Sequence, residues 1–165
     1  MTQPPLKKMS MKTFGIFIAI WLIGMIGVFA GSAIYNNYQG EQYSKTAIPY
    51  LQKVIPELSS WDPEQIKGLM APETLENIPE EQFRNMVNWF SKLGKLRSSE
   101  APVFEKIDSR LTKNGAQQKV VEYSVAATYE NGDARLNVKL LDLGDSFEIY
   151  HFSFGSEILS GKQTP

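Results

Sequence analysis

Apolar and polar residues follow three successive patterns along this chain, and each pattern predicts a different structure. Residues 14–35 form an apolar run without a charged residue. At about 1.5 Å of rise per residue, a helix of this length crosses the roughly 30 Å hydrocarbon core of a bilayer. Further along, apolar residues recur at helical spacing, and beyond Val103 they alternate. These patterns together predict a single transmembrane helix, followed by further helices and then by strands.

The basic residues around the apolar run indicate its orientation. Lys7, Lys8 and Lys12 precede the run, whereas the first basic residue after it is Lys45. Lysine and arginine close to a span stay on the cytoplasmic side. We therefore expect residues 1–13 in the cytoplasm and the C-terminal domain outside it, in a single-pass plasma membrane protein. In a bacterium this is the inner membrane, with the domain in the periplasm or on the outer face.

A cleaved signal peptide is the alternative explanation of the same run. Residues 14–30 would then be its apolar region and Gly31-Ser32-Ala33 its cleavage site, so that signal peptidase would release a secreted domain. The apolar regions of signal peptides are typically ~7–15 residues long, which is shorter than this run. The length favours a membrane anchor, and the lipid bilayer is the first expected partner.

Two glycines in the expected span predict a contact between helices. Gly27 and Gly31 form a GxxxG pair, and this spacing lets two helix backbones approach closely. Glycine is also simply common in transmembrane helices. The pair marks a candidate interface of a homodimer.

Helical spacing and helix-start signals dominate the first half of the domain. Apolar residues recur at helical spacing from Tyr43 to Leu58, and Asp62-Pro63 is typical of an N-cap followed by a first helical residue. Pro72 and Pro79 each open a further helical piece. The piece after Pro79 carries the clearest apolar stripe, followed by a glycine placed to cap its C-terminus: Phe83, Met86, Val87, Phe90, Leu93 and Gly94.

Alternation in the second half predicts antiparallel strands joined by tight turns. A strand ending at Tyr129 and a strand beginning near Ala134 flank Asn131-Gly132, a favoured two-residue hairpin turn. Such a turn sets Tyr129 opposite Ala134 and Tyr123 opposite Leu140. An earlier Asn114-Gly115 closes another hairpin, for which we expect a three-residue loop.

The expected last strand, from Phe147 to Phe154, has apolar residues on both faces. Strict alternation places Phe147 and Ile149 on one face and Tyr150, Phe152 and Phe154 on the other. Neither face of such a strand should be freely solvated. The second face therefore meets another subunit or lines a cavity, which makes Tyr150, Phe152 and Phe154 candidate interface residues.

This order of elements resembles the NTF2-like (cystatin-like) superfamily, especially exported or membrane-anchored members of it. The resemblance covers residues 42–158. It rests on five short segments: Trp61-Asp62, Ala71-Pro72-Glu73, Pro79-Glu80-Glu81-Gln82-Phe83, Leu93-Gly94-Lys95-Leu96, and the strand from Phe147 to Phe152 ending at Ser153.

The resemblance implies an α+β cone. Three N-terminal helical segments would lie against a four-stranded antiparallel meander sheet. The superfamily includes enzymes, ligand binders and non-catalytic assembly subunits, which are commonly dimeric through the sheet, so the fold does not assign an activity. No residue of this chain matches the Asp/His or Asp/Tyr set that the enzymes place inside the cone.

Composition narrows the chemistry further. The 165 residues include no cysteine, which excludes disulfides and thiolate metal sites, and a single histidine, which excludes a two-histidine metal site. The basic and acidic residues number 17 and 18, and the part beyond the expected span is mildly acidic. This balance provides no electrostatic footprint for nucleic acid. We expect neither a metal nor a cofactor.

His151 and Glu105 are the candidate chemical groups. By alternation His151 shares a strand face with Phe147 and Ile149, so it either points into the cone or is a partly exposed strand histidine. Glu105 is expected on the inner face beside Ile107, where burial would raise its pKa, unless the strand lies at an exposed edge. In the enzymatic alternative, an isomerase or hydrolase type of domain would use His151 as its base.

The most direct interpretation is a single-pass membrane protein that displays a non-catalytic NTF2-like domain outside the cytoplasm. After the expected span come a linker at 36–41, the domain at 42–158 and a disordered tail at 159–165. Expected partners besides the bilayer are a second copy of the chain, another envelope protein, or a small apolar ligand at the mouth of the cone.

Overall fold

The computed structural model describes residues 40–112 and 115–161, which belong to one compact unit, Gln39–Pro165. The expected transmembrane helix at 14–35, including Gly27 and Gly31, lies outside the described residues. Within the described part of the chain, no helix is long and apolar enough to span a bilayer.

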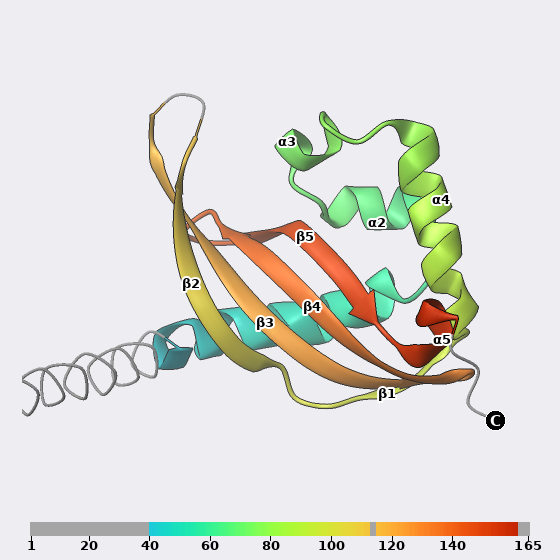
Figure 1. Cartoon of the computed structure of the whole chain (residues 1–165). Helices are drawn as coiled ribbons and strands as arrows, with labels where there is room; N and C mark the ends of the chain where they lie inside the picture. Colours follow the sequence, from blue (N-terminus) through green and yellow to red (C-terminus); the bar gives the residue numbers. More distant parts are fainter. Residues whose placement is uncertain (1–39, 113–114, 162–165) are drawn as a thin grey trace, which may run out of the picture. The chain divides into compact units, whose positions relative to one another are not determined.

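The domain is α+β, with several helices and a five-stranded antiparallel sheet (Figure 1). The described part of the first helix covers residues 40–58. The other elements are α2 (Pro63–Leu69), α3 (Pro72–Leu75), α4 (Glu80–Phe90), η1 (Ser91–Leu93), β1 (Leu96–Ser99), β2 (Val103–Leu111), β3 (Gln117–Tyr129), β4 (Gly132–Asp142), β5 (Phe147–Gly155) and α5 (Glu157–Ser160).

The sheet has one strand more than the four-stranded meander that the sequence predicts. The additional strand is β1, which pairs with the C-terminal end of β3, while β2 pairs with the N-terminal part of the same strand. Since β4 occupies the other edge of β3, β1 and β2 follow one another along a single edge. The length of β3 makes this possible.

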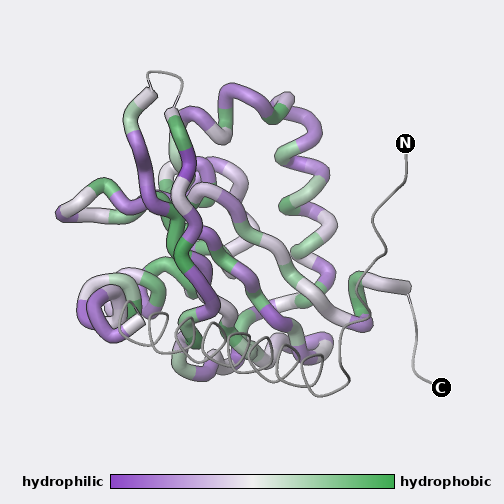
Figure 2. The backbone as a smooth tube through the Cα atoms, turned by 60° about the vertical axis from the view of Figure 1, so that its left-hand side comes forward, coloured by the Kyte–Doolittle hydropathy of each residue, from purple (hydrophilic) through white to green (hydrophobic). Residues whose placement is uncertain are grey.

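One face of the sheet packs against the first helix and α4, as the periodicity predicts (Figures 1 and 2). We call this the inner face. From α4, Phe83, Val87 and Phe90 are buried against it. The Phe90 ring contacts those of Phe152 and Phe154. The alternating buried positions of the central strands, including Tyr123 and Tyr129, belong to the same hydrophobic cluster. The space between these helices and the sheet is therefore filled by a continuous hydrophobic core.

The predicted start of α2 at Asp62 is confirmed. The Asp62 carboxylate accepts hydrogen bonds from the backbone N–H groups of Glu64 (2.9 Å) and Gln65 (3.4 Å).

We expect Asp62→Ala to lower the free energy of unfolding by about 1 kcal/mol, because these N–H groups lose their acceptor. Urea unfolding of the full chain measures this. Asp62→Asn, which keeps an acceptor oxygen, should stay close to the unsubstituted protein, and equal losses in both variants would contradict the capping role.

The predicted pairing of β3 with β4 is wrong by two residues. Tyr129 pairs with Gly132, and Tyr123 pairs with Val138, so the turn consists of Glu130 and Asn131. The segment before β1 holds this turn: the backbone N–H of Glu130 donates to the Lys95 carbonyl, and that of Asn131 donates to the Leu93 carbonyl. Because the shift is even, each side chain keeps its face of the sheet.

The hairpin at Asn114-Gly115 has the expected loop length. The backbone N–H of Thr112 donates to the Ala116 carbonyl at 2.9 Å, which encloses three residues, and Gly115 has a positive φ of 78°. Residues 113 and 114 of this loop lie outside the described residues.

A β-bulge in β5 changes which residues of this strand face the core. Lys139 pairs with His151 and Leu140 pairs with Ile149, so Tyr150 is the extra residue. Past the bulge the alternation is inverted. Phe152 and Phe154 therefore join Ile149 on the inner face and are only 3% and 7% exposed. The predicted partner-facing side of Tyr150, Phe152 and Phe154 is wrong for the two phenylalanines, since their rings contact the core of their own chain.

Candidate functional site

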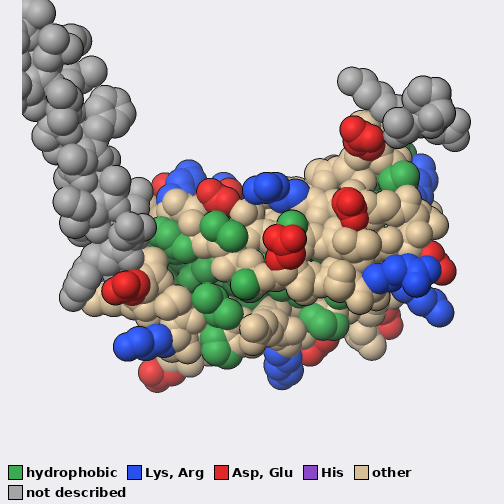
Figure 3. Space-filling model, turned by 90° about the horizontal axis from the view of Figure 1, so that it is seen from below, with side chains coloured by type: hydrophobic (Ala, Val, Ile, Leu, Met, Phe, Trp, Pro, Cys, Tyr) green, Lys and Arg blue, Asp and Glu red, His purple; other side chains and the backbone are tan. Residues whose placement is uncertain are grey.

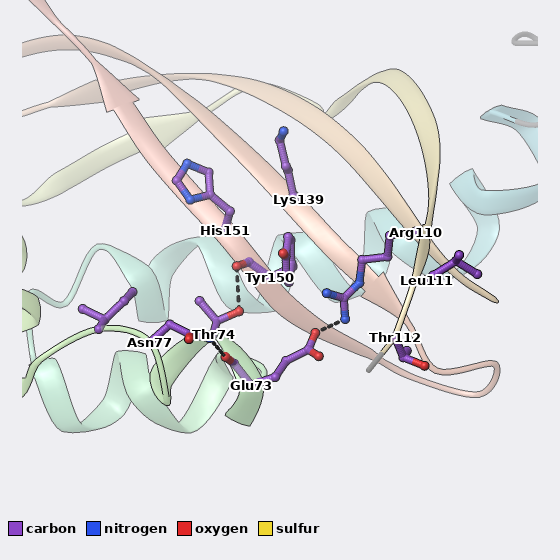
Figure 4. Close-up of a pocket in the computed structure, with 10 residues that line it drawn as sticks. Glu73, Thr74, Asn77, Arg110, Leu111, Thr112, Lys139, Tyr150 and His151 are labelled. Carbon is purple, nitrogen blue, oxygen red and sulfur yellow. Dashed lines mark hydrogen bonds and ion pairs between the residues drawn. The ribbon is translucent and has the colours of Figure 1, made fainter. Parts of the chain in front are cut away.

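A cleft lies on the outer face of the sheet, opposite the core. The chain reaches this face by passing the free edge of β5, where the Ala71 N–H donates to the Ile149 carbonyl at 2.9 Å and the Thr74 hydroxyl donates to the Tyr150 carbonyl at 3.0 Å. The cleft has a volume of about 480 Å³ and is lined by Glu73, Thr74, Asn77, Ile78, Arg110, Leu111, Thr112, Lys139, Tyr150 and His151 (Figure 4).

Arg110 joins the β2–β3 hairpin to α3 across the cleft. Its guanidinium forms an ion pair with Glu73 and donates to Gln118 Oε1 at 2.8 Å. It also lies over the Tyr150 ring, 4.5 Å from the centroid. Within the described residues its Nε atom is buried without a hydrogen-bond partner. These contacts hold the guanidinium in one orientation and place a positive charge in the wall of the cleft.

Lys139 and His151 come from neighbouring strands, β4 and β5, and are directly paired in the sheet. Among the described residues, the carboxylate oxygen nearest to Lys139 Nζ is Glu122 Oε2, at 3.7 Å. Although His151 is exposed, partial desolvation of its ring, followed by the charge of Lys139, lowers its pKa below the ordinary value, and Glu122 opposes this shift. The imidazole is therefore mainly neutral at pH 7.

The remaining lining gives the cleft a mixed character. Asn77 Nδ2 donates to the Glu73 carbonyl at 2.7 Å, and Ile78 and Leu111 supply apolar surface. Of the charged lining residues that the structure describes, Glu73 and Arg110 pair with each other, which leaves Lys139 as the cation without a partner inside the lining. The surface seen from below in Figure 3 differs from the cleft, because acidic and basic side chains are interspersed there around exposed hydrophobic ones.

Alternation left open whether His151 points into the interior, and in the structure it does not. The bulge at Tyr150 turns it to the outer face, where it is exposed. Glu105 is likewise not on the inner face. A bulge in β2 separates the Phe104–Tyr123 and Lys106–Glu122 pairs, and the Glu105 carboxylate accepts a hydrogen bond from the Ser124 hydroxyl (2.6 Å).

The inner face holds different polar groups. The Tyr123 hydroxyl is buried without a hydrogen-bond partner in the described part of the chain, and burial raises the pKa of Tyr123 to about 12. The Tyr43 hydroxyl donates to Asp142 Oδ2 at 2.5 Å. Burial and this carboxylate raise the pKa of Tyr43. Both hydroxyls are therefore protonated, that of Tyr123 inside the core and that of Tyr43 at its partly buried margin.

Of the candidate residues from the sequence, the structure brings only Tyr150 and His151 into the cleft. Sequence reasoning missed Glu73, Arg110 and Lys139. Their only signal is that Arg110 and Lys139 occupy polar positions of alternating strands, whereas Glu73 reads as a first-turn helix carboxylate. In the described residues, no group of three or more His, Cys, Asp or Glu side chains is arranged to hold a metal ion.

Comparisons of this chain with protein-family models, curated proteins and solved structures found no match. The cleft and the sheet that carries it are therefore interpreted from their own geometry.

Proposed function

We propose that this chain is a single-pass membrane protein whose NTF2-like domain lies outside the cytoplasm and binds a partner through the cleft, without catalysing a reaction. The apolar run at 14–35 and the lysines before it support the anchor and its orientation. Helices followed by a bent antiparallel sheet support the NTF2-like assignment of the domain. The partner is another envelope protein or a small molecule.

The single observation that carries the binding role is the contrast between the two faces of the sheet. Core side chains fill the inner side, where NTF2-like enzymes keep their pocket, whereas charged and polar groups converge on an open cleft on the outer side. A concave site with a few convergent polar groups is typical of ligand binding. His151 is exposed on the outer face, which argues against an enclosed imidazole base.

Photocrosslinking in intact cells tests the proposal. A photoreactive amino acid at Leu111, which lines the cleft and is 74% exposed, is expected to give a discrete crosslinked product. Val103 is a matched control, because it is an exposed hydrophobic residue (59%) of the same strand and does not line the cleft. Equal products from both positions, or none from Leu111, would contradict binding of a partner protein in the cleft.

The same cells test the topology. Protease added to spheroplasts should remove a C-terminal epitope and leave the N-terminal residues 1–13 protected. Protection of the C-terminal epitope in intact spheroplasts would overturn the location of the domain outside the cytoplasm.

A further inference from the structure

We infer that the cleft binds an oxyanion, a carboxylate or phosphate group of its ligand, between Lys139 and His151. This inference rests on the proposed binding role of the cleft and assigns the chemistry of its ligand. No residue of the expected membrane span takes part in it.

The pairing of the two side chains is the first support. Lys139 and His151 are directly opposite on adjacent antiparallel strands, and the Cβ atoms of such residues are about 4.5–5.5 Å apart. Both project from the same face of the sheet (Figure 4). A protonated imidazole and an ammonium so placed can donate to two oxygens of one carboxylate or phosphate.

The second support is that Lys139 has unused hydrogen-bonding capacity. Its distance of 3.7 Å from Glu122 Oε2 is too long for a hydrogen bond. Glu122 shares the same oxygen with Lys106, also at 3.7 Å, and Lys106 pairs more closely with Asp108, at 2.8 Å. A single distant carboxylate therefore leaves the Lys139 ammonium available to a ligand.

The third support is the fixed arrangement of the surrounding wall. The Arg110 guanidinium is occupied by Glu73 and Gln118, so its charge is balanced by Glu73 and it contributes rigidity to the wall rather than donors to the ligand. Lys139 and Glu122 are the charged groups that act on His151 along its row of the sheet, and the paired Arg110 and Glu73 line the same cleft. An arriving anion offsets the repulsion between Lys139 and a protonated His151, so binding of the oxyanion favours protonation of the imidazole.

The apolar part of the lining completes the ligand class. Ile78 follows α3 and Leu111 ends β2, and both line the cleft. A volume of about 480 Å³ is in the usual range for small-molecule sites. The structure therefore favours a small ligand that joins one oxyanion to an apolar portion. The oxyanion can belong to a soluble molecule or to a lipid headgroup.

The single histidine makes the test direct, because His151 is the only imidazole of the chain. Its NMR signals are followed from about pH 5 to 8 in the full-length protein in neutral detergent micelles. One series contains inorganic phosphate and the other contains chloride at the same ionic strength. We expect phosphate to raise the pKa of His151 by about one unit, which corresponds to about tenfold tighter binding of phosphate to the protonated imidazole.

Two lysine variants separate the cleft from general charge effects. In Lys139→Gln the pKa of His151 in chloride should rise, because the neighbouring cation is gone, and the additional rise with phosphate should largely disappear. Lys106→Gln removes a lysine of the same sheet face that does not line the cleft. In this variant, phosphate should still raise the pKa of His151. Identical titrations in phosphate and chloride, or an undiminished phosphate effect in Lys139→Gln, would overturn the inference.

Bilayer nanodiscs distinguish the source of the oxyanion. If it is a lipid headgroup, phosphatidylglycerol should raise the pKa of His151 relative to phosphatidylcholine, and Lys139→Gln should abolish the rise. A rise that survives in Lys139→Gln reflects the surface potential of the bilayer and counts against the headgroup. A crosslink at Leu111 without a phosphate effect would refute the oxyanion and leave binding of a partner protein intact. A phosphate effect without a crosslink at Leu111 would refute only the partner protein and leave the cleft as a small-molecule site.

Discussion

Replacing Phe154 with alanine is expected to lower the free energy of unfolding by about 3–5 kcal/mol. The Phe154 ring is buried, and its centroid lies 5.4 Å from that of Trp61, 5.0 Å from that of Phe90 and 6.0 Å from that of Tyr129. Removing it leaves a cavity among aromatic rings that come from separate elements and cannot all move together to fill it. Urea unfolding of the full chain, followed by tryptophan fluorescence, measures the loss.

Tyr150→Ala is the matched control for this prediction, because simple alternation places Tyr150 and Phe154 on the same face. In the structure Tyr150 is half-buried beneath Arg110 on the outer side of the bulge. Its removal should cost less than half as much stability. If the two variants lose equal stability, or if Tyr150→Ala loses more, the position of the bulge is wrong.

Replacing Gly94 with alanine is expected to lower the free energy of unfolding by about 2–4 kcal/mol. Gly94 has φ 78° and ψ −160°, a conformation that side chains disfavour. A Cβ atom there would lie 2.8 Å from the Cβ of Glu130 and 3.1 Å from Asn131 Nδ2. The Gly94 carbonyl also accepts a hydrogen bond from Trp61 Nε1 at 2.8 Å, so a shift of the backbone would disturb the Trp61 ring.

Gly68→Ala controls for the substitution itself. Gly68 is exposed in α2, and a Cβ atom there would meet nothing within 4 Å. Because alanine favours helix more than glycine does, this variant should be stabilised by up to about 1 kcal/mol. Stability losses of similar size at both positions would contradict the special conformation of Gly94.

The start of α2 and the buried stripe of α4 were predictable because they depend on neighbouring residues. Asp62 caps the N–H groups two and three residues further on, and Gly94 ends its helix with a positive φ. The stripe of α4 faces the core because residues three and four apart share one side of a helix. Each of these features is local, so the sequence pattern was sufficient. The short helix α5 was not predicted: residues 159–165 were expected to be a disordered tail, but Leu159 of α5 is buried in the hydrophobic core.

Strand register and the orientation of β5 were not predictable in the same way. The Asn131-Gly132 dipeptide correctly indicated a hairpin between β3 and β4. The turn itself is Glu130-Asn131, because the backbone of these two residues is hydrogen-bonded to Lys95 and Leu93, more than thirty residues earlier. The bulge at Tyr150 is a property of the pairing between β4 and β5. With or without the bulge, β5 has apolar residues on both faces, so the sequence pattern does not reveal it. A single extra residue then exchanges the faces of every residue beyond it.

The sequence by itself determined the α+β order, the N-cap of α2, the stripe of α4 and the alternating core positions of β3 and β4, because propensity, capping and periodicity act over a few residues. Only the tertiary structure decided that His151 lies outside, that Phe152 and Phe154 lie inside, and that a cleft exists at all. Glu73, Arg110 and His151 meet there because the chain passes the edge of β5 and the β2–β3 hairpin reaches α3. Contacts between such distant segments depend on how whole elements pack, which no local pattern encodes.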